Sequence, residues 1–400
     1  MSCPFGDKKG RSAGSSDLTR LHRETADLAA YITYTKLDDN TKLKEQISAD
    51  SNFSLTRGGL TLLANSTIGF TLNPVTGAIV YPPPGPPKPP PPLPPGPLLW
   101  VAGAVSENIL AYSSDGIIWE QSANGNSIFD TVFNIAWNGT IWVAAGGTGS
   151  VRLGYSSDGI TWTESANGNS ILDIVYGVAW GGGMWVACGA GTVKLAYSYD
   201  GITWTESPYR VNQPNNVIIA VAWGGGVWVA GGTGTVKILY SSDGIDWRAS
   251  VSGSITFTSV WDIAWNGTLF LAAGGVFTPS RPGQRIGYSS DGINWTASVN
   301  ANSIFSTVWA VAWGGGKWVA GGEGVNTLGY SSDGITWYAS ENGNSLISVV
   351  HTVAWEETAS RWVAGGAGIN NLIFSADGIS WTPSANGNST LGTVYAVVSK

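Results

Sequence analysis

The sequence predicts an all-β protein, a seven-bladed β-propeller closed by its C-terminal strand, and three observations support this prediction. A stretch written most plainly as YSSDGITW, residues 155–162, recurs seven times. Successive copies lie 42 to 48 residues apart, a period that indicates repeat units that bury their apolar faces by stacking. The array also begins and ends inside a unit. The aspartates of the seven copies are Asp115, Asp158, Asp200, Asp243, Asp291, Asp333 and Asp377.

The composition narrows the class of protein. The chain has 400 residues, a net charge of -7, 12% charged residues, 55 Gly and 21 Trp, which is typical of a tightly packed β-protein. The acidic balance argues against nucleic acid as the main partner. The sequence contains no apolar run long enough for a membrane span and no signal-peptide core near the N-terminus. We therefore expect synthesis in the cytoplasm.

The cysteines and histidines suggest no metal, cofactor or redox chemistry. Cys3 lies near the terminus and Cys188 inside a predicted strand, so a disulfide between them is not expected. His22 and His351 lie in unrelated contexts, and we expect surface or packing roles for both. These four residues do not provide a set of metal ligands.

The first 81 residues are predicted to form a separate part. Residues 1–16 are small and polar, as in a flexible tail, and residues 17–48 carry apolar side chains near heptad spacing. Either a helical pair packed on neighbouring chains or a lone amphipathic helix explains that spacing. Residues 52–81 change to short β-type runs, too few to hold a core alone. We expect residues 17–81 to anchor the protein or to associate with other copies.

Residues 82–97 form a proline-rich linker. Twelve of the sixteen positions are Pro, and a polyproline II segment of this length reaches about 50 Å. It is therefore a stiff spacer between the N-terminal part and residues 98–400.

Each repeat of residues 98–400 is predicted to contain four strands, which in one unit are residues 175–180, 184–187, 194–197 and 202–205. The first two strands are apolar at nearly every position, which indicates burial on both faces between stacked blades. Tryptophan recurs at the end of strand one, at the start of strand two and after the Asp-Gly turn. We interpret most of these rings as wedges between blades rather than as sugar-stacking platforms. Two others, Trp261 and Trp309, lie inside strand one.

The ends of the array predict how the ring closes. The array begins with a second strand, residues 98–102, and finishes with an unpaired first strand, residues 394–398. Pairing of the last strand with the first three completes one blade and leaves no open edge. A solenoid would instead need capping repeats at both ends.

Asp-Gly between two β-type runs is a strong hairpin signal, because Gly accepts positive φ and the carboxylate binds N–H groups of its own turn. The Ser-x-Asp-Gly-x-x-Trp pattern resembles the Asp-box of the bacterial neuraminidase repeat, although here Gly follows Asp directly. The resemblance implies that the seven aspartates lock turns and take no part in catalysis.

The turns after strands one and three lie on one side of a blade, here called the turn face, and the variable connections lie on the other, the loop face. Amide-rich Asn-Gly-Asn-Ser connections on the loop face suit either hydroxyl-bearing ligands or plain turns. We expect ligand binding on this face. The candidates are four cations at the start of strand three and two arginines in long loops, and the alternative for the four is that they solvate strand ends. These residues are Arg152, Lys194, Lys237 and Arg285, with Arg210 and Arg281 in the loops.

Catalysis finds little support. Neuraminidases with the Asp-box use an arginine triad, a tyrosine nucleophile and an acid/base aspartate, and no such set is recognisable here. The repeats behind a proline-rich stalk resemble surface or fibre proteins of large DNA viruses and phages. That resemblance implies a non-catalytic module on a virion surface that binds host glycan or protein, with residues 1–81 attached to the particle or to other copies. A divergent glycoside hydrolase and an intracellular protein-interaction propeller remain alternatives.

Overall fold

The computed structural model describes residues 100–105, 108–147, 149–209, 217–275 and 283–400, together with four short strands of an N-terminal unit. The chain divides into two compact units, residues 1–85 and 86–400. In the first unit, β1 (Phe53–Thr56) pairs with β2 (Gly59–Leu62), and β3 (Thr71–Leu72) pairs with β4 (Ile79–Val80). The predicted tail, the heptad-spaced residues and the proline-rich linker lie outside the described residues.

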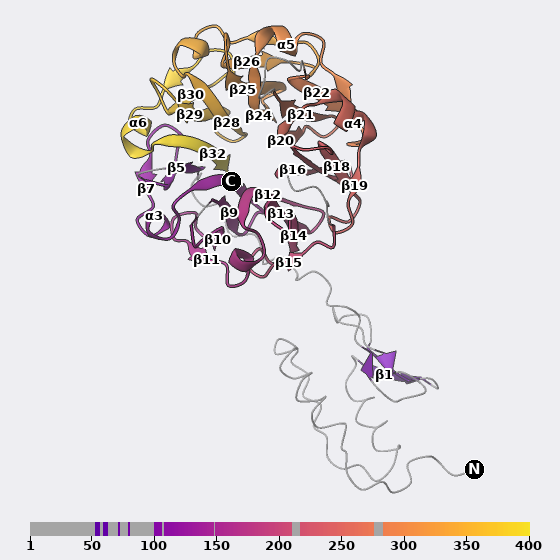
Figure 1. The fold of residues 1–400 in the computed structure, drawn as a ribbon. Coiled ribbons are helices and arrows are strands. Elements are labelled where there is room, and N and C mark those ends of the chain that lie inside the picture. Colours follow the sequence, from indigo (N-terminus) through magenta and orange to yellow (C-terminus); the bar gives the residue numbers. More distant parts are fainter. Residues whose placement is uncertain are drawn as a thin grey trace, which may run out of the picture. The chain divides into compact units, whose positions relative to one another are not determined.

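Seven four-stranded antiparallel sheets form a ring, shown in Figure 1, and this confirms the predicted propeller. Blade 1 combines β32 (Thr393–Ser399), β5 (Trp100–Val105), β6 (Leu110–Ser113) and β7 (Glu120–Gln121). Blade 2 contains β8 (Val132–Trp137), β9 (Trp142–Gly146), β10 (Leu153–Ser156) and β11 (Thr163–Glu164). Blade 3 contains β12 (Ile174–Gly181), β13 (Met184–Ala190), β14 (Leu195–Ser198) and β15 (Thr205–Glu206).

The remaining four blades repeat this order. Blade 4 contains β16 (Ile218–Gly224), β17 (Val227–Gly232), β18 (Ile238–Ser241) and β19 (Arg248–Ala249). Blade 5 contains β20 (Val260–Trp265), β21 (Phe270–Gly274), β22 (Ile286–Ser289) and β23 (Thr296–Ala297). Blade 6 contains β24 (Thr307–Gly314), β25 (Lys317–Glu323), β26 (Leu328–Ser331) and β27 (Tyr338–Ala339). Blade 7 contains β28 (Val349–Glu356), β29 (Arg361–Ala367), β30 (Leu372–Ser375) and β31 (Thr382–Pro383).

The C-terminal strand closes the ring as the sequence predicts. β32 pairs antiparallel with β5, with Val397 opposite Ala102 and Ser399 opposite Trp100. The pairing joins the two ends of the array in one sheet, so blade 1 has no missing strand. Among the described residues, no helix is both long and apolar enough to cross a membrane.

The core lies between the blades. The tryptophans that open strand two are almost completely buried, as Trp185 and Trp228 show. Tryptophans at the end of strand one pack on the preceding blade, and a Cβ added to Gly181 would lie 2.2 Å from the Trp223 side chain. This close approach explains why the turn after strand one carries Gly in that blade.

Among the described connections, short helices precede six of the first strands, where the sequence suited either a ligand site or plain turns. They are α3 (Gly125–Ile128), η1 (Gly168–Ser170), α4 (Val251–Thr256), α5 (Ala301–Ile304), η2 (Gly343–Ser345) and α6 (Gly387–Thr390). A side chain binds each helix to the next blade, an asparagine before the helix in five cases and Ser252 in α4. Asn124 Nδ2 donates to the Trp162 carbonyl at 2.7 Å, and Asn124 Oδ1 accepts from Trp162 N at 2.8 Å. Asn386 makes the same pair with Trp119 across the closure.

The Asp-Gly turns are held by the aspartate itself. Asp158 Oδ1 accepts from Ile160 N at 2.8 Å and from Thr161 N at 2.7 Å, and Ser156 Oγ lies 2.9 Å from the same oxygen. Gly159 has a φ of 75°, a value that Gly adopts without strain. Partial burial alone would raise the pKa of Asp158, but these hydrogen bonds outweigh it and the pKa lies below its ordinary value.

Candidate binding site at the mouth of the channel

Every first strand contains a β-bulge, at which the pairing register with strand two skips one residue. In β12, Val175 pairs with Gly189 and Gly177 pairs with Cys188, so that Tyr176 is left over. The same irregularity recurs at one register position in all seven blades. We call the seven residues that the register skips the collar, and from blade 1 to blade 7 they are Tyr395, Phe133, Tyr176, Ile219, Trp261, Trp309 and His351.

The collar surrounds the central channel. The first strands lie innermost in their sheets, next to one another around the axis (Figure 1), so each has a free edge toward the channel. A bulge on such a strand turns its extra side chain away from the ladder, which points it at the axis. All seven collar side chains are partly buried. Because the bulge lies near the start of each first strand, the collar lies at the loop-face end of the channel.

Six of the seven collar residues are aromatic, and their rings touch from blade to blade. His351 stacks on Tyr395 with ring centroids 4.5 Å apart and planes at 15°. The other contacts are Trp261 with Trp309 at 4.8 Å, Trp309 with His351 at 5.9 Å, Phe133 with Tyr395 at 5.7 Å and Phe133 with Tyr176 at 5.2 Å. The chain of contacting rings therefore runs through blades 5, 6, 7, 1, 2 and 3, and Ile219 in blade 4 is the aliphatic member.

The collar is uncharged at neutral pH. Burial lowers the pKa of His351 to about 4, so its imidazole is neutral.

The carboxyl group of Asp262, next to Trp261 in sequence, is buried and accepts from Val311 N at 2.9 Å and from Ile263 N at 2.8 Å. Burial raises the pKa of Asp262 to about 7 in spite of these bonds.

The four predicted cations each bind a loop carbonyl of the propeller. Lys194 Nζ donates to Gly191 O at 2.6 Å, and Lys237 Nζ donates to Gly234 O. Arg152 Nε donates to Asp173 O at 2.6 Å, and an Arg285 guanidinium nitrogen donates to Gly283 O at 2.7 Å. Since one donor or more of each group is already engaged, the structure gives these residues a role in fixing loops. Ligand binding by them stays a prediction, and Arg210 and Arg281 lie outside the described residues.

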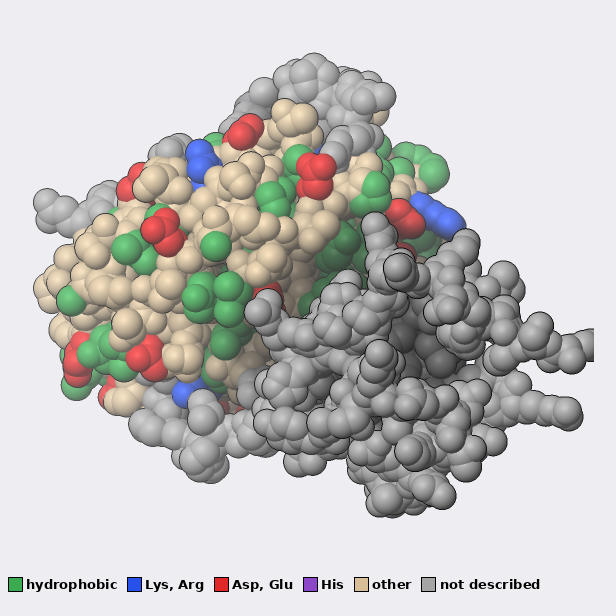
Figure 2. Space-filling view, turned by 90° about the horizontal axis from the view of Figure 1, so that it is seen from below, with side chains coloured by type: hydrophobic (Ala, Val, Ile, Leu, Met, Phe, Trp, Pro, Cys, Tyr) green, Lys and Arg blue, Asp and Glu red, His purple; other side chains and the backbone are tan. Residues whose placement is uncertain are grey.

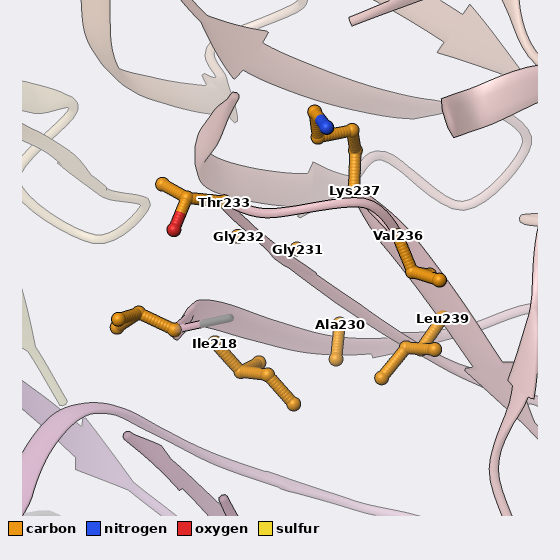
Figure 3. A pocket seen from close by; sticks show the side chains of 9 residues that line it. Ile218, Ala230, Gly231, Gly232, Thr233, Val236, Lys237 and Leu239 are labelled. Atoms are coloured by element: carbon orange, nitrogen blue, oxygen red, sulfur yellow. The ribbon is translucent and has the colours of Figure 1, made fainter. Parts of the chain in front are cut away.

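Figure 2 shows one side of the molecule, where the described Lys and Arg side chains are scattered among uncharged ones. Figure 3 shows a small hollow in blade 4 that Ile218, Ala230 and Leu239 line, and the Lys237 side chain points away from these apolar groups. This hollow lies within one blade and offers mainly apolar side chains.

The comparisons with known proteins give the fold. The GH74 enzyme of Niastella koreensis matches with a TM-score of 0.52 and 16% identity, over 75% of this chain and 52% of that one. A Bacteroides uniformis protein provisionally assigned as a 6-phosphogluconolactonase matches with a TM-score of 0.52 and 11% identity, over 76% and 99%. YCF48 from Cyanidioschyzon merolae matches with a TM-score of 0.47 and 13% identity, over 71% and 96%.

The Niastella koreensis and Bacteroides uniformis proteins share their fold with this chain. No family model and no curated protein matches the sequence, and the chain spans about half the length of the GH74 enzyme. At such low identity the likeness extends to the fold alone, since one propeller architecture carries many functions.

The collar was not predicted from the sequence. Trp261 and Trp309 were expected inside strand one and His351 in a surface or packing role, since the Asp-Gly turn is the more conspicuous repeat. Alignment on the first strand shows the missed signal: the residue after Val132, Val175 or Val260 is aromatic, and six of seven repeats follow this rule. The loop amides, in contrast, are used up in bonds such as those of Asn124 and Asn386.

Proposed function

We propose that the protein is a binding module without catalytic activity, which takes its ligand at the loop-face mouth of the channel. The collar is the observation that carries this proposal. Six aromatic side chains from six blades converge at one height, and each keeps part of its surface accessible. Convergent, partly exposed aromatic side chains in a concave place are typical of ligand sites.

The arrangement of the carboxylates supports binding rather than hydrolysis. A glycosidase of the usual kind needs two carboxyl groups that flank the scissile bond. The turn aspartates accept backbone N–H groups in their own turns, as Asp158 does, and they lie on the turn face. Asp262, beside the collar, is buried and bound to two backbone N–H groups. We therefore assign the collar a role in recognition.

The setting that we propose is the surface of a virus or phage particle. The repeat style and the proline-rich residues 82–97 support this setting, and the ligand there would be a host glycan or a host-surface protein. Residues 1–81 would attach the module to the particle or to other copies. The oligomeric states of the full chain and of residues 98–400, measured as masses in solution, test the attachment. We expect a monomeric fragment and a self-associating full chain. A full chain that is as monomeric as the fragment and binds no particle contradicts the attachment.

One experiment on the full chain tests binding against catalysis. The protein is applied to a glycan array and to a panel of host-surface proteins, and the same sample is incubated with glycoside substrates. We expect binding without turnover, and binding that Trp309→Ala weakens. Turnover of a glycoside by the parent protein contradicts the proposal, as does binding that survives in Trp309→Ala while the variant keeps the melting temperature of the parent.

A further inference from the structure

We infer that the collar recognises one uncharged sugar ring, entering from the loop face at the end of a neutral glycan. The inference rests on the proposed binding function and names its ligand. Its first support is the chemistry of the seven side chains. Each aromatic ring has an apolar face, and Tyr176, Tyr395 and His351 add polar groups at the ring edges. A pyranose has the matching character, with C–H groups on its faces and hydroxyl groups around its edge.

The second support is size. Neighbouring ring centroids lie between 4.5 and 5.9 Å apart, and seven positions at such spacing lie on a circle about 6 Å in radius. When a contact distance of about 3.5 to 4 Å is subtracted, a radius of only about 2 Å is left at the axis, which is too narrow for a pyranose with its hydroxyl groups. A single sugar ring would therefore lie across the loop-face side of the aromatic rings.

The third support is charge. The collar has no charged member at neutral pH, since His351 is neutral there. The cations nearest in register, Lys194 and Lys237 among them, donate to loop carbonyls. An anionic sugar would lose hydration at the collar without gaining a partner of opposite charge. A neutral sugar avoids this cost, because its C–H groups can contact the aromatic faces and its hydroxyl groups can form hydrogen bonds.

The test compares collar variants on matched glycans. The full chain is applied to an array that presents neutral oligosaccharides beside their sialylated and sulfated forms, and the hits are measured by calorimetry with the corresponding neutral methyl glycosides. We expect hits among the neutral members. Trp309→Ala should weaken the binding on the order of 10- to 100-fold, as the loss of a central aromatic contact does.

Two further variants control for folding and for place. Tyr395→Phe removes one hydroxyl, keeps the ring, and should weaken binding by about 3- to 10-fold. Tyr338→Ala removes an aromatic ring that is 54% exposed on the outer strand β27, and binding should not change.

The outcomes separate the ligand from the function. Hits restricted to anionic glycans, or neutral hits that Trp309→Ala and Tyr395→Phe leave unchanged, overturn the neutral-sugar inference. Binding of a host-surface peptide that Trp309→Ala abolishes, with no hit on the array, also overturns it but leaves the binding module intact. A chain that binds no glycan and no protein, or one that turns glycosides over, overturns both.

Discussion

Two sets of seven positions recur in register around the propeller, the turn aspartates and the collar, and they behave in opposite ways. The turn position holds Asp in every blade, and each carboxylate accepts backbone N–H groups two and three residues further on, as Asp115 and Asp377 do. The collar position holds Tyr, Phe, Ile, Trp or His on the same bulged backbone. The turn aspartate therefore holds the backbone of its turn through hydrogen bonds, whereas the collar side chain can change without a change in the backbone.

This difference indicates where a repeat protein keeps structure and where it can place function. A turn aspartate cannot change without leaving backbone N–H groups unsatisfied. The side chain of a bulge residue takes no part in strand pairing, so each blade can present a different side chain at the same height. A repeat position that holds the same residue in every blade therefore indicates a role in stability, and one that holds different residues indicates a role in recognition. Four changes to the protein test this comparison.

Loss of β32 should have the largest effect. Deletion of residues 393–400 removes the collar member Tyr395 together with the strand that pairs with β5, and it exposes the edge of blade 1. We expect a loss on the order of 5 kcal/mol or more, with aggregation. Thermal unfolding and light scattering measure it, with removal of Lys400 alone as the control. A truncated protein that melts with the parent contradicts closure by β32.

The contribution of Asp262, beside the collar, to the free energy of unfolding should change with pH in the opposite sense to that of the turn aspartates. The folded-state pKa of Asp262 is about 7, above its value near 4 in the unfolded chain, so the folded state holds the extra proton. The stability from this proton is complete below pH 4 and is lost as the pH rises through 7. Asp262→Asn should therefore raise the free energy of unfolding at pH 8 by about 2 to 4 kcal/mol.

Urea unfolding at pH 5 and pH 8 measures this prediction. Asn fits the position, because Asn134 at the same place in blade 2 accepts from Val178 N at 3.1 Å. A variant whose gain over the parent is no larger at pH 8 than at pH 5 speaks against the raised pKa of Asp262.

A turn aspartate should matter for stability and not for binding. Asp158→Ala leaves two backbone N–H groups of its turn without a partner, and we expect a loss of about 1 to 3 kcal/mol with unchanged ligand affinity. Because the pKa of Asp158 is lowered, its contribution is present above pH 4 and is lost as the pH falls through the folded-state value. Calorimetry with a bound ligand measures the affinity of Asp158→Ala, and thermal unfolding measures its stability. Weaker binding at an unchanged melting temperature would assign this turn to the binding site.

The smallest effect is expected from the four cations. Replacement of Arg152, Lys194, Lys237 and Arg285 by Ser removes contacts to loop carbonyls and should cost about 1 to 2 kcal/mol in total. Binding of a neutral glycan should stay within about 2-fold. Measurements at two ionic strengths sharpen the comparison. Weaker binding with a flatter salt dependence would show that the cations form the site, as the sequence suggested.

Much of the fold was accessible from the sequence because it is written in local patterns. The Asp-Gly turn at Asp158, the Gly turn after Trp180 and the incomplete repeat at each end fix strand order and closure, since each depends on neighbours in the chain. The short helices were missed because they are stabilised across blades, as by the bonds of Asn124 to Trp162.

The sequence by itself determined the number of blades, their strand order and the strand that completes blade 1, because hairpin turns and burial patterns are properties of one repeat. Only the tertiary structure decided what the bulge residues do. Tyr395 and Phe133 lie 262 positions apart in the chain, and their rings meet because ring closure places β32 in blade 1, next to β8 of blade 2. A site assembled from one residue per blade depends on the curvature of the ring, which no single repeat encodes.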